Sequence, residues 1–321
     1  IKQQDLDHLS ASLKKYYDVS VDMEGREFVK IEFDWDYEQG KVHLSMKPYL
    51  LKALRQFDNL IPNKKQDSPY PHVPPKYGEK QQFAEYDNSP NVGKEKQKEV
   101  QTISGKFLWY ARAVDNKLLY ALSDIGSEQA AATTRTNQKV HQLLDYCATY
   151  PNDGITFRAS DMVLGAHSDA AFLNASNSRS RAAAHIMCSE DDPVPSYNGP
   201  ILTIAQIIKT VMSSAAEAEL AGLFICAKEM VPLRQSLIAM GWPQPKSPIQ
   251  TDNTTALGVA NKTIIAKRMK SMDMRLWWLR CRESQGQFRY FWGPGPNNLA
   301  DYSSKAHPDI YYESQRPIHA G

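Results

Sequence analysis

The spacing of apolar residues in the first half of the chain is mainly helical. Leu6, Leu9 and Leu13 recur at intervals of three and four positions, which places them on one face of a helix. A similar stripe follows Pro48, a residue type that favours the first turn of a helix. The predicted elements are helices over 5–17, from Pro48 onward, over 100–122 and over 136–150, and strands over 28–33 and 41–46 joined by a loop at 36–40.

Beyond Pro151 the pattern changes to extended runs followed by alternating helices and strands. The longest of these helices carries Leu220, Phe224, Ala227 and Val231 at spacings of four, three and four. The order of elements is β-β-β-α-β-α-α-β-α, which is typical of an α/β domain. The predicted strands are 155–157 with 162–167, 182–188, 200–211, a run ending at Asp252, and 288–292, and the predicted helices are 214–240, 254–261, 269–285 and 297–304.

Length and composition indicate about two domains with sizeable cores. The 321 residues are 42% hydrophobic and 23% charged, and no apolar run approaches the ~20 residues that a membrane-spanning helix needs. The net charge is only +2, so any affinity for nucleic acid must come from local clusters. The four cysteines are widely spaced, which argues against a disulfide framework and a zinc site. Because the sequence begins at Ile1 without an apolar leader, we treat it as a piece of a longer chain.

Acidic residues stand at the ends of several predicted elements. Asp169 and Asp252 follow strands, a glutamate lies near the start of the long helix, and Asp301 lies on the last helix. Carboxylates in these places can converge on one edge of a sheet, where they would need cations to stay ionised. Hard divalent ions prefer oxygen ligands, and phosphoryl chemistry commonly uses two of them. The implied cofactor is therefore a pair of Mg²⁺ ions, with Mn²⁺ as a substitute.

At these positions the sequence resembles a known family. The segments AHSDA (166–170), SSAAEAEL (213–220), QTDN (250–253) and NLAD (298–301) are similar to the four acidic motifs of the ribonuclease H domain of copia-type LTR retrotransposon polyproteins. Upstream, FVKIE (28–32), GKVHLS (40–45), YLL (49–51) and ISGKFLWY (103–110) resemble the stretch that follows the polymerase active site in that family. The resemblance covers nearly the whole chain and is strongest over 165–305.

The resemblance implies a ribonuclease H-like mixed sheet flanked by helices, preceded by a smaller α+β and helical remnant of a reverse transcriptase. The region 62–95 holds six prolines and several lysines, a composition that indicates a linker or a surface arm. The implied division is a palm-like region at 1–61, this linker at 62–95, a helical thumb- or connection-like region at 96–154 and the ribonuclease H-like domain at 155–321.

The implied activity is endonucleolytic hydrolysis of RNA in RNA–DNA hybrids. Asp169, Glu219, Asp252 and Asp301 would be both the catalytic residues and the metal ligands. The implied partners are the hybrid and the rest of a retroelement polyprotein, and the implied location is a cytoplasmic virus-like particle or the nucleus. The family's Tyr-x-Asp-Asp-like polymerase motif is absent from the sequence, so DNA synthesis is not expected. Two alternatives stay open: a remnant of the fold that binds nucleic acid without cutting it, and the integrases and resolvases that share the fold.

Each acidic residue also has a structural interpretation. Asp169 could end a strand in a turn, Asp252 could cap the helix that follows it, and Asp301 could be an ordinary first-turn carboxylate. Glu217 and Glu219 are about 200° apart around a helix axis, so only one can face the sheet. Periodicity does not choose between them, whereas the family register selects Glu219.

The most basic part of the chain lies between 267 and 289, where Trp277 and Trp278 stand among the arginines. Lys and Arg neutralise phosphates, and a hybrid is recognised through its shape, backbone and 2′-hydroxyls. The alternative is a solvated helix face. The predicted nucleic-acid-binding residues are Asn253, Lys267, Arg268, Lys270, Arg275 and Arg280. His307, six positions after Asp301, is interpreted as a surface or capping residue.

Overall fold

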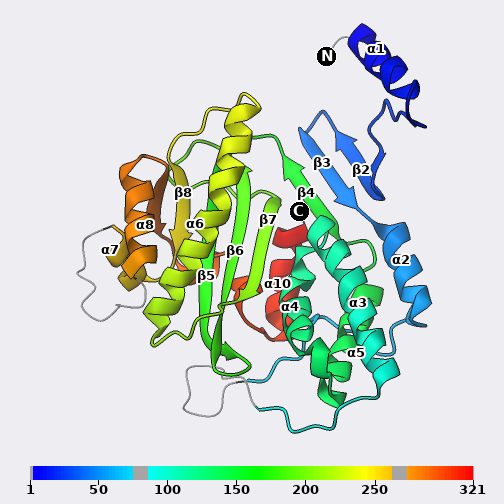
Figure 1. Ribbon diagram of the computed structural model, residues 1–321, viewed down its shortest axis with the longest axis vertical. Coiled ribbons are helices and arrows are strands. Elements are labelled where there is room, and N and C mark those ends of the chain that lie inside the picture. Colours follow the sequence, from blue (N-terminus) through cyan, green and yellow to red (C-terminus); the bar gives the residue numbers. More distant parts are fainter. Residues whose placement is uncertain (1–2, 75–85, 262–272, 321) are drawn as a thin grey trace.

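The computed structural model describes residues 3–74, 86–261 and 273–320 (Figure 1). It has one five-stranded and one four-stranded sheet, with helices around them. The helices are α1 (Gln3–Lys14), α2 (Lys47–Gln56), α3 (Lys94–Ala113), α4 (Leu119–Glu128), α5 (Thr134–Thr149), α6 (Ala215–Ala239), α7 (Thr254–Ala260), α8 (Asp273–Ser284), α9 (Asp301–Ser304) and α10 (Asp309–Ala320). The strands are β1 (Glu27–Phe28), β2 (Ile31–Asp36), β3 (Lys41–Ser45), β4 (Gly154–Arg158), β5 (Val163–Ala175), β6 (Arg179–Ser189), β7 (Pro200–Ile207), β8 (Ser247–Thr251) and β9 (Phe288–Trp292).

The five-stranded sheet has the order β7-β6-β5-β8-β9. Its first three strands in sequence, β5, β6 and β7, are joined antiparallel, whereas β8 and β9 run parallel to β5. The chain crosses from β7 to β8 through α6, which packs along β5 and β6. The predicted α/β architecture, a mixed sheet flanked by helices, is confirmed.

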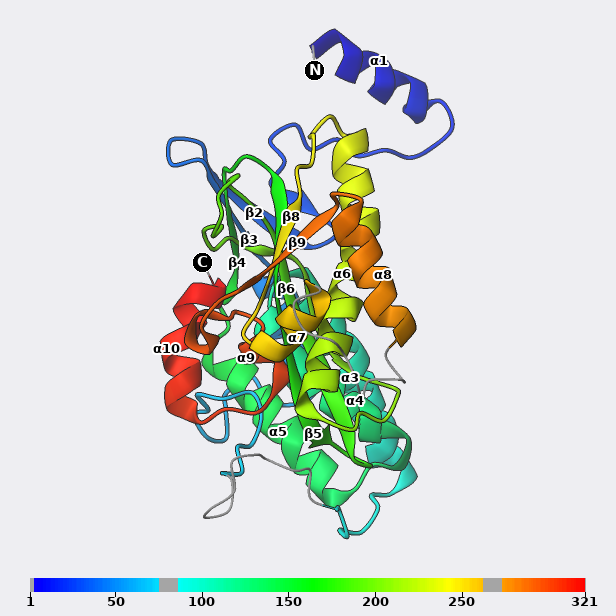
Figure 2. The same ribbon diagram turned by 90° about the vertical axis from the view of Figure 1, so that its left-hand side faces the viewer.

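Helices cover both faces of this sheet. Ala182, Ala184 and Ile186 of β6 belong to the core that packs against α6. Because side chains alternate along a strand, Arg181 and His185 point to the opposite face, where they meet α4 and α10. Figure 2 shows α6 and α8 on one side of the sheet and α9 and α10 on the other. Helix α4 of the upstream helical region therefore packs against this second face of the sheet.

The four-stranded sheet joins segments that are far apart in sequence. Its order is β1-β2-β3-β4, with all neighbours antiparallel, and Leu44 of β3 lies opposite Ile155 of β4. Residues 155–157 therefore pair with β3, and not with the strands of the α/β domain with which the sequence pattern groups them. Gly154 is required here, because a Cβ at this position would lie 2.3 Å from the carbonyl oxygen of Leu44.

The single helix predicted over 100–122 is wrong, since the chain forms α3 and α4 with a break between them. At the break, Lys117 is fully buried and its Nζ lies 2.9 Å from Asp115 and 3.1 Å from Asp153. A charge buried this deeply is stable only beside opposite charges, and these three residues hold the turn in place. Helix α10 is an element that the sequence analysis did not predict.

The described parts of the Pro- and Lys-rich region are attached to the helices. Residues 62–74, called the strap below, lie against α5 and include the fully buried Ser68. The second part forms a β-bridge between Asn91 and Thr133. Hydrogen bonds hold these two described parts against the helices, despite the low apolar content of the region.

Helix α1 stands apart from the rest of the molecule in both views (Figures 1 and 2) and buries none of its residues. Within the three described stretches, no helix has both the length and the apolar character needed to cross a bilayer.

Candidate active site

Three carboxylates meet beside the five-stranded sheet. Asp169 lies on β5, Asp252 directly follows β8, and Glu219 lies near the start of α6; each offers one oxygen, and these oxygens lie within 4.8 Å of one another. The register explains the meeting of the two aspartates. His167 of β5 is paired with Gln250 of the parallel strand β8, so each aspartate lies two residues beyond a paired position.

The two glutamates of α6 have different roles. Ser214 caps the helix by accepting a hydrogen bond from the amide of Glu217, 3.2 Å away. The carboxylate of Glu217 in turn accepts from the amide of Ser213 at 2.9 Å. These bonds hold Glu217 at the helix end, while Glu219 faces the two aspartates.

Burial and mutual repulsion make this cluster costly when it is ionised. Burial, and then the nearby charge of Asp301, raise the pKa of Asp169 to about 7. Burial and the charge of Asp169 raise the pKa of Glu219 well above its usual value. The pKa of Asp252 is raised by burial and by Asp301. Glu219 Oε2 is also buried without a hydrogen-bond partner within the described chain. Crowded carboxylates, one of them with an unpartnered oxygen, form an all-oxygen ligand set that suits a hard divalent cation.

Asp301 stands beside this cluster but outside the group of three. It begins α9, and its carboxylate forms an ion pair with Lys305 and accepts a hydrogen bond from the Tyr311 hydroxyl at 3.3 Å. His307, interpreted from sequence as a surface or capping residue, is buried, and its Nε2 donates to the Asp301 carbonyl at 2.9 Å. The capping interpretation of His307 fits this contact, whereas the surface interpretation is wrong. Burial lowers the pKa of His307.

Asn253 caps α7, a role that was considered for Asp252. Its side-chain oxygen accepts a hydrogen bond from the amide of Ala256 at 2.9 Å. The carboxylate of Asp252 is therefore not needed as the cap and can face Asp169. The predicted contact between Asn253 and nucleic acid stays a prediction.

The predicted basic cluster is described only in part, since Lys267, Arg268 and Lys270 lie outside the described residues. Arg280 donates two hydrogen bonds to the Val259 carbonyl, at 3.1 and 2.7 Å, and so ties α8 to α7. Arg275 reaches the Thr210 hydroxyl at 3.4 Å. These contacts give both arginines structural roles, and their predicted binding of nucleic acid stays a prediction.

A cavity of about 490 Å³ opens beside the three carboxylates. Asp169, Glu219 and Asp252 line it together with Lys305, His307 and His72. The sequence pattern does not single out His72, because nothing in the composition of the strap connects this residue to a site on a distant sheet.

No protein-family profile matches the sequence, and a search of curated proteins finds no relative. Several solved structures resemble part of the chain, among them the following three ribonucleases H. A ribonuclease H1 isolated from compost by a metagenomic approach is 10% identical, with a TM-score of 0.34, over 44% of this chain and 91% of that one. The N-terminal ribonuclease H domain of a Mycobacterium tuberculosis protein is 14% identical, with a TM-score of 0.32, over 44% and 95%. Ribonuclease H1 of Halobacterium salinarum is 16% identical, with a TM-score of 0.27, over 44% and 93%.

Proposed function

We propose that this chain is a ribonuclease H that hydrolyses the RNA strand of RNA–DNA hybrids with Mg²⁺ as cofactor. One observation carries the proposal: Asp169, Glu219 and Asp252, from three distant segments, bring oxygens within 4.8 Å of one another beside an open cavity. They stand in the segments that resemble the acidic motifs of copia-type elements.

Asp169, Glu219 and Asp252 would hold the divalent ions, with Asp301 as the neighbouring fourth carboxylate. When bound, such ions activate water as a nucleophile and stabilise charge on a leaving oxygen. The residues of the chain position the reactants and need not form a covalent bond with the substrate. Lys305, paired with Asp301, adds a positive charge at the edge of the cluster and limits the repulsion among the carboxylates.

The wider context of the proposal is a retroelement polyprotein. The chain would contribute the end of a palm-like region and a connection-like region, followed by the nuclease. Because the Tyr-x-Asp-Asp-like motif is missing, the chain itself is not expected to synthesise DNA. In this context the protein would act in a cytoplasmic virus-like particle or in the nucleus.

A comparison of substrates tests the proposal. Labelled RNA–DNA hybrid, double-stranded DNA and double-stranded RNA are each incubated with the protein in Mg²⁺, and binding of each is measured in EDTA. We expect cleavage of the RNA strand in the hybrid alone. Binding of the hybrid in EDTA without cleavage in Mg²⁺ would instead favour the inactive binding remnant, and cleavage of DNA would favour the integrase or resolvase class.

A further inference from the structure

The carboxylate of Asp301 is held at both of its oxygens. Oδ1 pairs with the Lys305 ammonium, and Oδ2 accepts a hydrogen bond from the Tyr311 hydroxyl at 3.3 Å. The two donors differ in rigidity. Lys305 has a long flexible side chain that is 45% exposed, whereas Tyr311 is a half-buried residue of α10 with only two side-chain torsions. The tyrosine therefore fixes the direction of the carboxylate more firmly than the lysine does.

The ring of Tyr311 is itself fixed by a neighbour that also binds Asp301. The His307 ring stacks on it, with the ring centroids 3.7 Å apart and the planes 11° from parallel. His307 is buried, and its Nε2 donates to the Asp301 carbonyl at 2.9 Å. The stacked pair thus contacts Asp301 at both its backbone and its carboxylate.

Helix α10 presents this pair from a fixed position. It lies with α9 on one side of the five-stranded sheet (Figure 2). Near its end, the guanidinium of Arg316 lies 3.5 Å from the ring centroid of Tyr150, at the end of α5. The buried ring of His319 packs against that of His185 on β6, with the centroids 5.6 Å apart. These contacts far from Asp301 leave Tyr311, near the start of the helix, little freedom to move.

We propose that Tyr311 is a positioning residue of the metal site, whose hydroxyl directs the Asp301 carboxylate so that it can serve as a further ligand of ions held by the other three carboxylates. This inference rests on the proposed function, which assigns divalent ions to that cluster. Partners that hydrogen-bond to a ligating carboxylate orient it and commonly change metal affinity when they are removed.

Electrostatics supports the two parts of this arrangement. Burial, and then the charge of Asp301, raise the pKa of Asp169, and the same two causes raise that of Asp252. The Asp301 carboxylate is therefore close enough to act on the same ions. Burial, and then the charge of Asp301, also raise the pKa of Tyr311. Its phenol hence stays protonated and keeps the hydrogen that it donates.

The test compares Mg²⁺ binding by the parent protein, Tyr311→Phe and Tyr312→Phe, measured as Kd by isothermal titration calorimetry. Tyr311→Phe removes the hydroxyl but keeps the ring and every charge, so it changes only the orientation of the carboxylate. We expect it to raise the Kd for Mg²⁺ roughly three- to tenfold, as for loss of one hydrogen bond to a charged group. Tyr312→Phe removes the same atom from the next residue of α10, whose ring packs edge-on against Tyr302 with the centroids 4.9 Å apart. This control should bind Mg²⁺ like the parent protein.

Two further measurements separate positioning from other roles of Tyr311. In an Asp301→Ala background, Tyr311→Phe should have no further effect on the Kd for Mg²⁺, because the carboxylate that it orients is gone. The Kd for hybrid in EDTA should be equal in Tyr311→Phe and the parent protein. The melting temperature in EDTA checks that each variant folds.

The inference is overturned by an equal Kd for Mg²⁺ in Tyr311→Phe and the parent protein, or by an undiminished effect in the Asp301→Ala background. Weaker hybrid binding by Tyr311→Phe in EDTA would also overturn it, since the hydroxyl would then contact the substrate. A parent protein that binds no Mg²⁺ would contradict the proposed function and this inference together. A parent protein that binds Mg²⁺ but does not cut hybrid would contradict the proposed function alone, because the Kd values for Mg²⁺ still test Tyr311.

Discussion

Gly222 of α6 lies against the backbone of Asp169. A Cβ on this glycine would be 3.1 Å from the Asp169 carbonyl oxygen and 3.3 Å from the Cβ of Ala170. Helix α6 can therefore approach β5 more closely than a larger residue would allow. Glu219 precedes Gly222 by about one helical turn, so the close approach carries its carboxylate to the cluster.

Gly222→Ala should move α6 away from β5 by a few tenths of an ångström. Small displacements of catalytic groups are costly, and we expect hybrid cleavage to fall roughly three- to tenfold. The gain in helix propensity, about 1 kcal/mol, should offset much of the steric cost in stability. Gly126→Ala in α4 is the matched control, because a Cβ there meets nothing within 4 Å. It should raise stability and leave cleavage unchanged. Full activity in Gly222→Ala would show that the close approach does not position Glu219.

Asp169→Asn should stabilise the metal-free protein at neutral pH. Asp169 has a pKa of about 7 in the folded chain, against 3.8 as its ordinary value. Between these values the folded state binds more protons than the unfolded state, so the contribution of this group to stability falls as pH rises through the window. In EDTA, the melting temperature of Asp169→Asn should exceed that of the parent protein by an amount that grows from pH 4 to pH 8.

The difference in melting temperature between the two proteins reports on the Asp169 carboxyl group. The pKa values of buried His167 and His185 are lowered to about 3 and about 4, mainly by burial, so both proteins should lose stability below the ordinary histidine pKa. That loss is common to both proteins and cancels in the comparison. Adding Mg²⁺ at pH 8 should raise the melting temperature of the parent protein more than that of Asp169→Asn. A difference that does not depend on pH would argue against the crowded site.

Lys305→Met tests the counter-charge beside the cluster. Lys305 pairs with Asp301, but its side chain is 45% exposed, so the pair should stabilise the fold by about 1 kcal/mol or less. Removal of the Lys305 charge increases the repulsion among the carboxylates of the cluster. We expect a lower melting temperature in EDTA and a larger rise on addition of Mg²⁺ than in the parent protein. Lys228→Met, at an exposed position of α6, should change neither value. An equal Mg²⁺ response in all three proteins would rule out electrostatic coupling between Lys305 and the proposed metal site.

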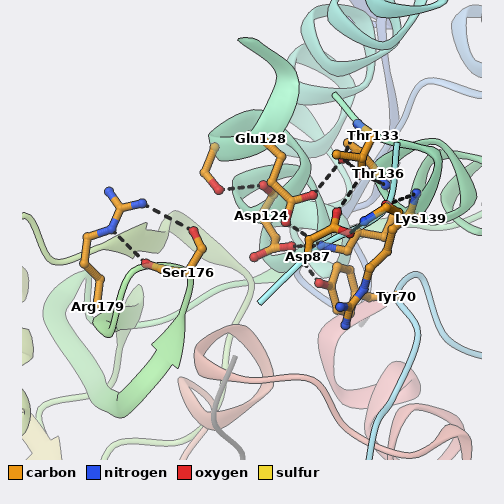
Figure 3. A network of polar contacts seen from close by, with 12 residues as sticks. Tyr70, Asp87, Asp124, Glu128, Thr133, Thr136, Lys139, Ser176 and Arg179 are labelled. Atoms are coloured by element: carbon orange, nitrogen blue, oxygen red, sulfur yellow. Dashed lines mark hydrogen bonds and ion pairs between the residues drawn. The ribbon is translucent and has the colours of Figure 1, made fainter. Parts of the chain in front are cut away.

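Arg181→Met tests whether the sheet and the upstream helices form one folding unit. Arg181 is fully buried; its guanidinium lies 3.1 Å from Asp124 and 2.7 Å from the Ser123 hydroxyl, and it stacks over Tyr120 at 4.6 Å. Asp124 keeps Lys139 as a partner, and we expect a loss of about 3 kcal/mol in the free energy of unfolding. Arg179→Met is the control: Arg179 bonds Ser176 within its own hairpin (Figure 3) and should change stability by less than about 0.5 kcal/mol.

The outcome of chemical denaturation decides this point. A single transition that shifts with Arg181→Met is expected if α4 and the five-stranded sheet unfold together. Two separate transitions, with Arg181→Met affecting neither, would contradict the coupling and would favour independent domains divided near residue 155.

Local patterns in the sequence were sufficient for much of the fold. The helical spacing around Leu220 predicted α6, and the short apolar run before Asp252 predicted β8. The sequence pattern predicted that the carboxylates converge at one edge of a sheet, but it ended the first strand before Asp169, whereas Asp169 lies within β5 and only Asp252 follows its strand, β8. The structure adds the reason that Glu219 faces them and Glu217 does not. The Glu217 carboxylate accepts a hydrogen bond from the Ser213 amide at the start of α6.

Features that depend on distant partners could not be predicted. The break between α3 and α4 depends on Asp153, which pairs with Lys117 from 36 positions further along the chain. The pairing of Ile155 with Leu44 is similar, since a short strand carries no signal for which sheet it will join. Hydrogen bonds at Ser68 and Tyr70 hold the strap where His72 lines the cavity. The periodicity of the sequence contains no information about such contacts.

Cleavage of an RNA–DNA hybrid by the purified chain, with Asp169→Asn measured in parallel, tests the central claim most directly. The claim predicts that the parent protein cuts the RNA strand in Mg²⁺, that EDTA abolishes cutting, and that Asp169→Asn loses roughly 10³-fold in rate while it still folds and binds hybrid. Cleavage by Asp169→Asn at the rate of the parent protein would contradict the claim.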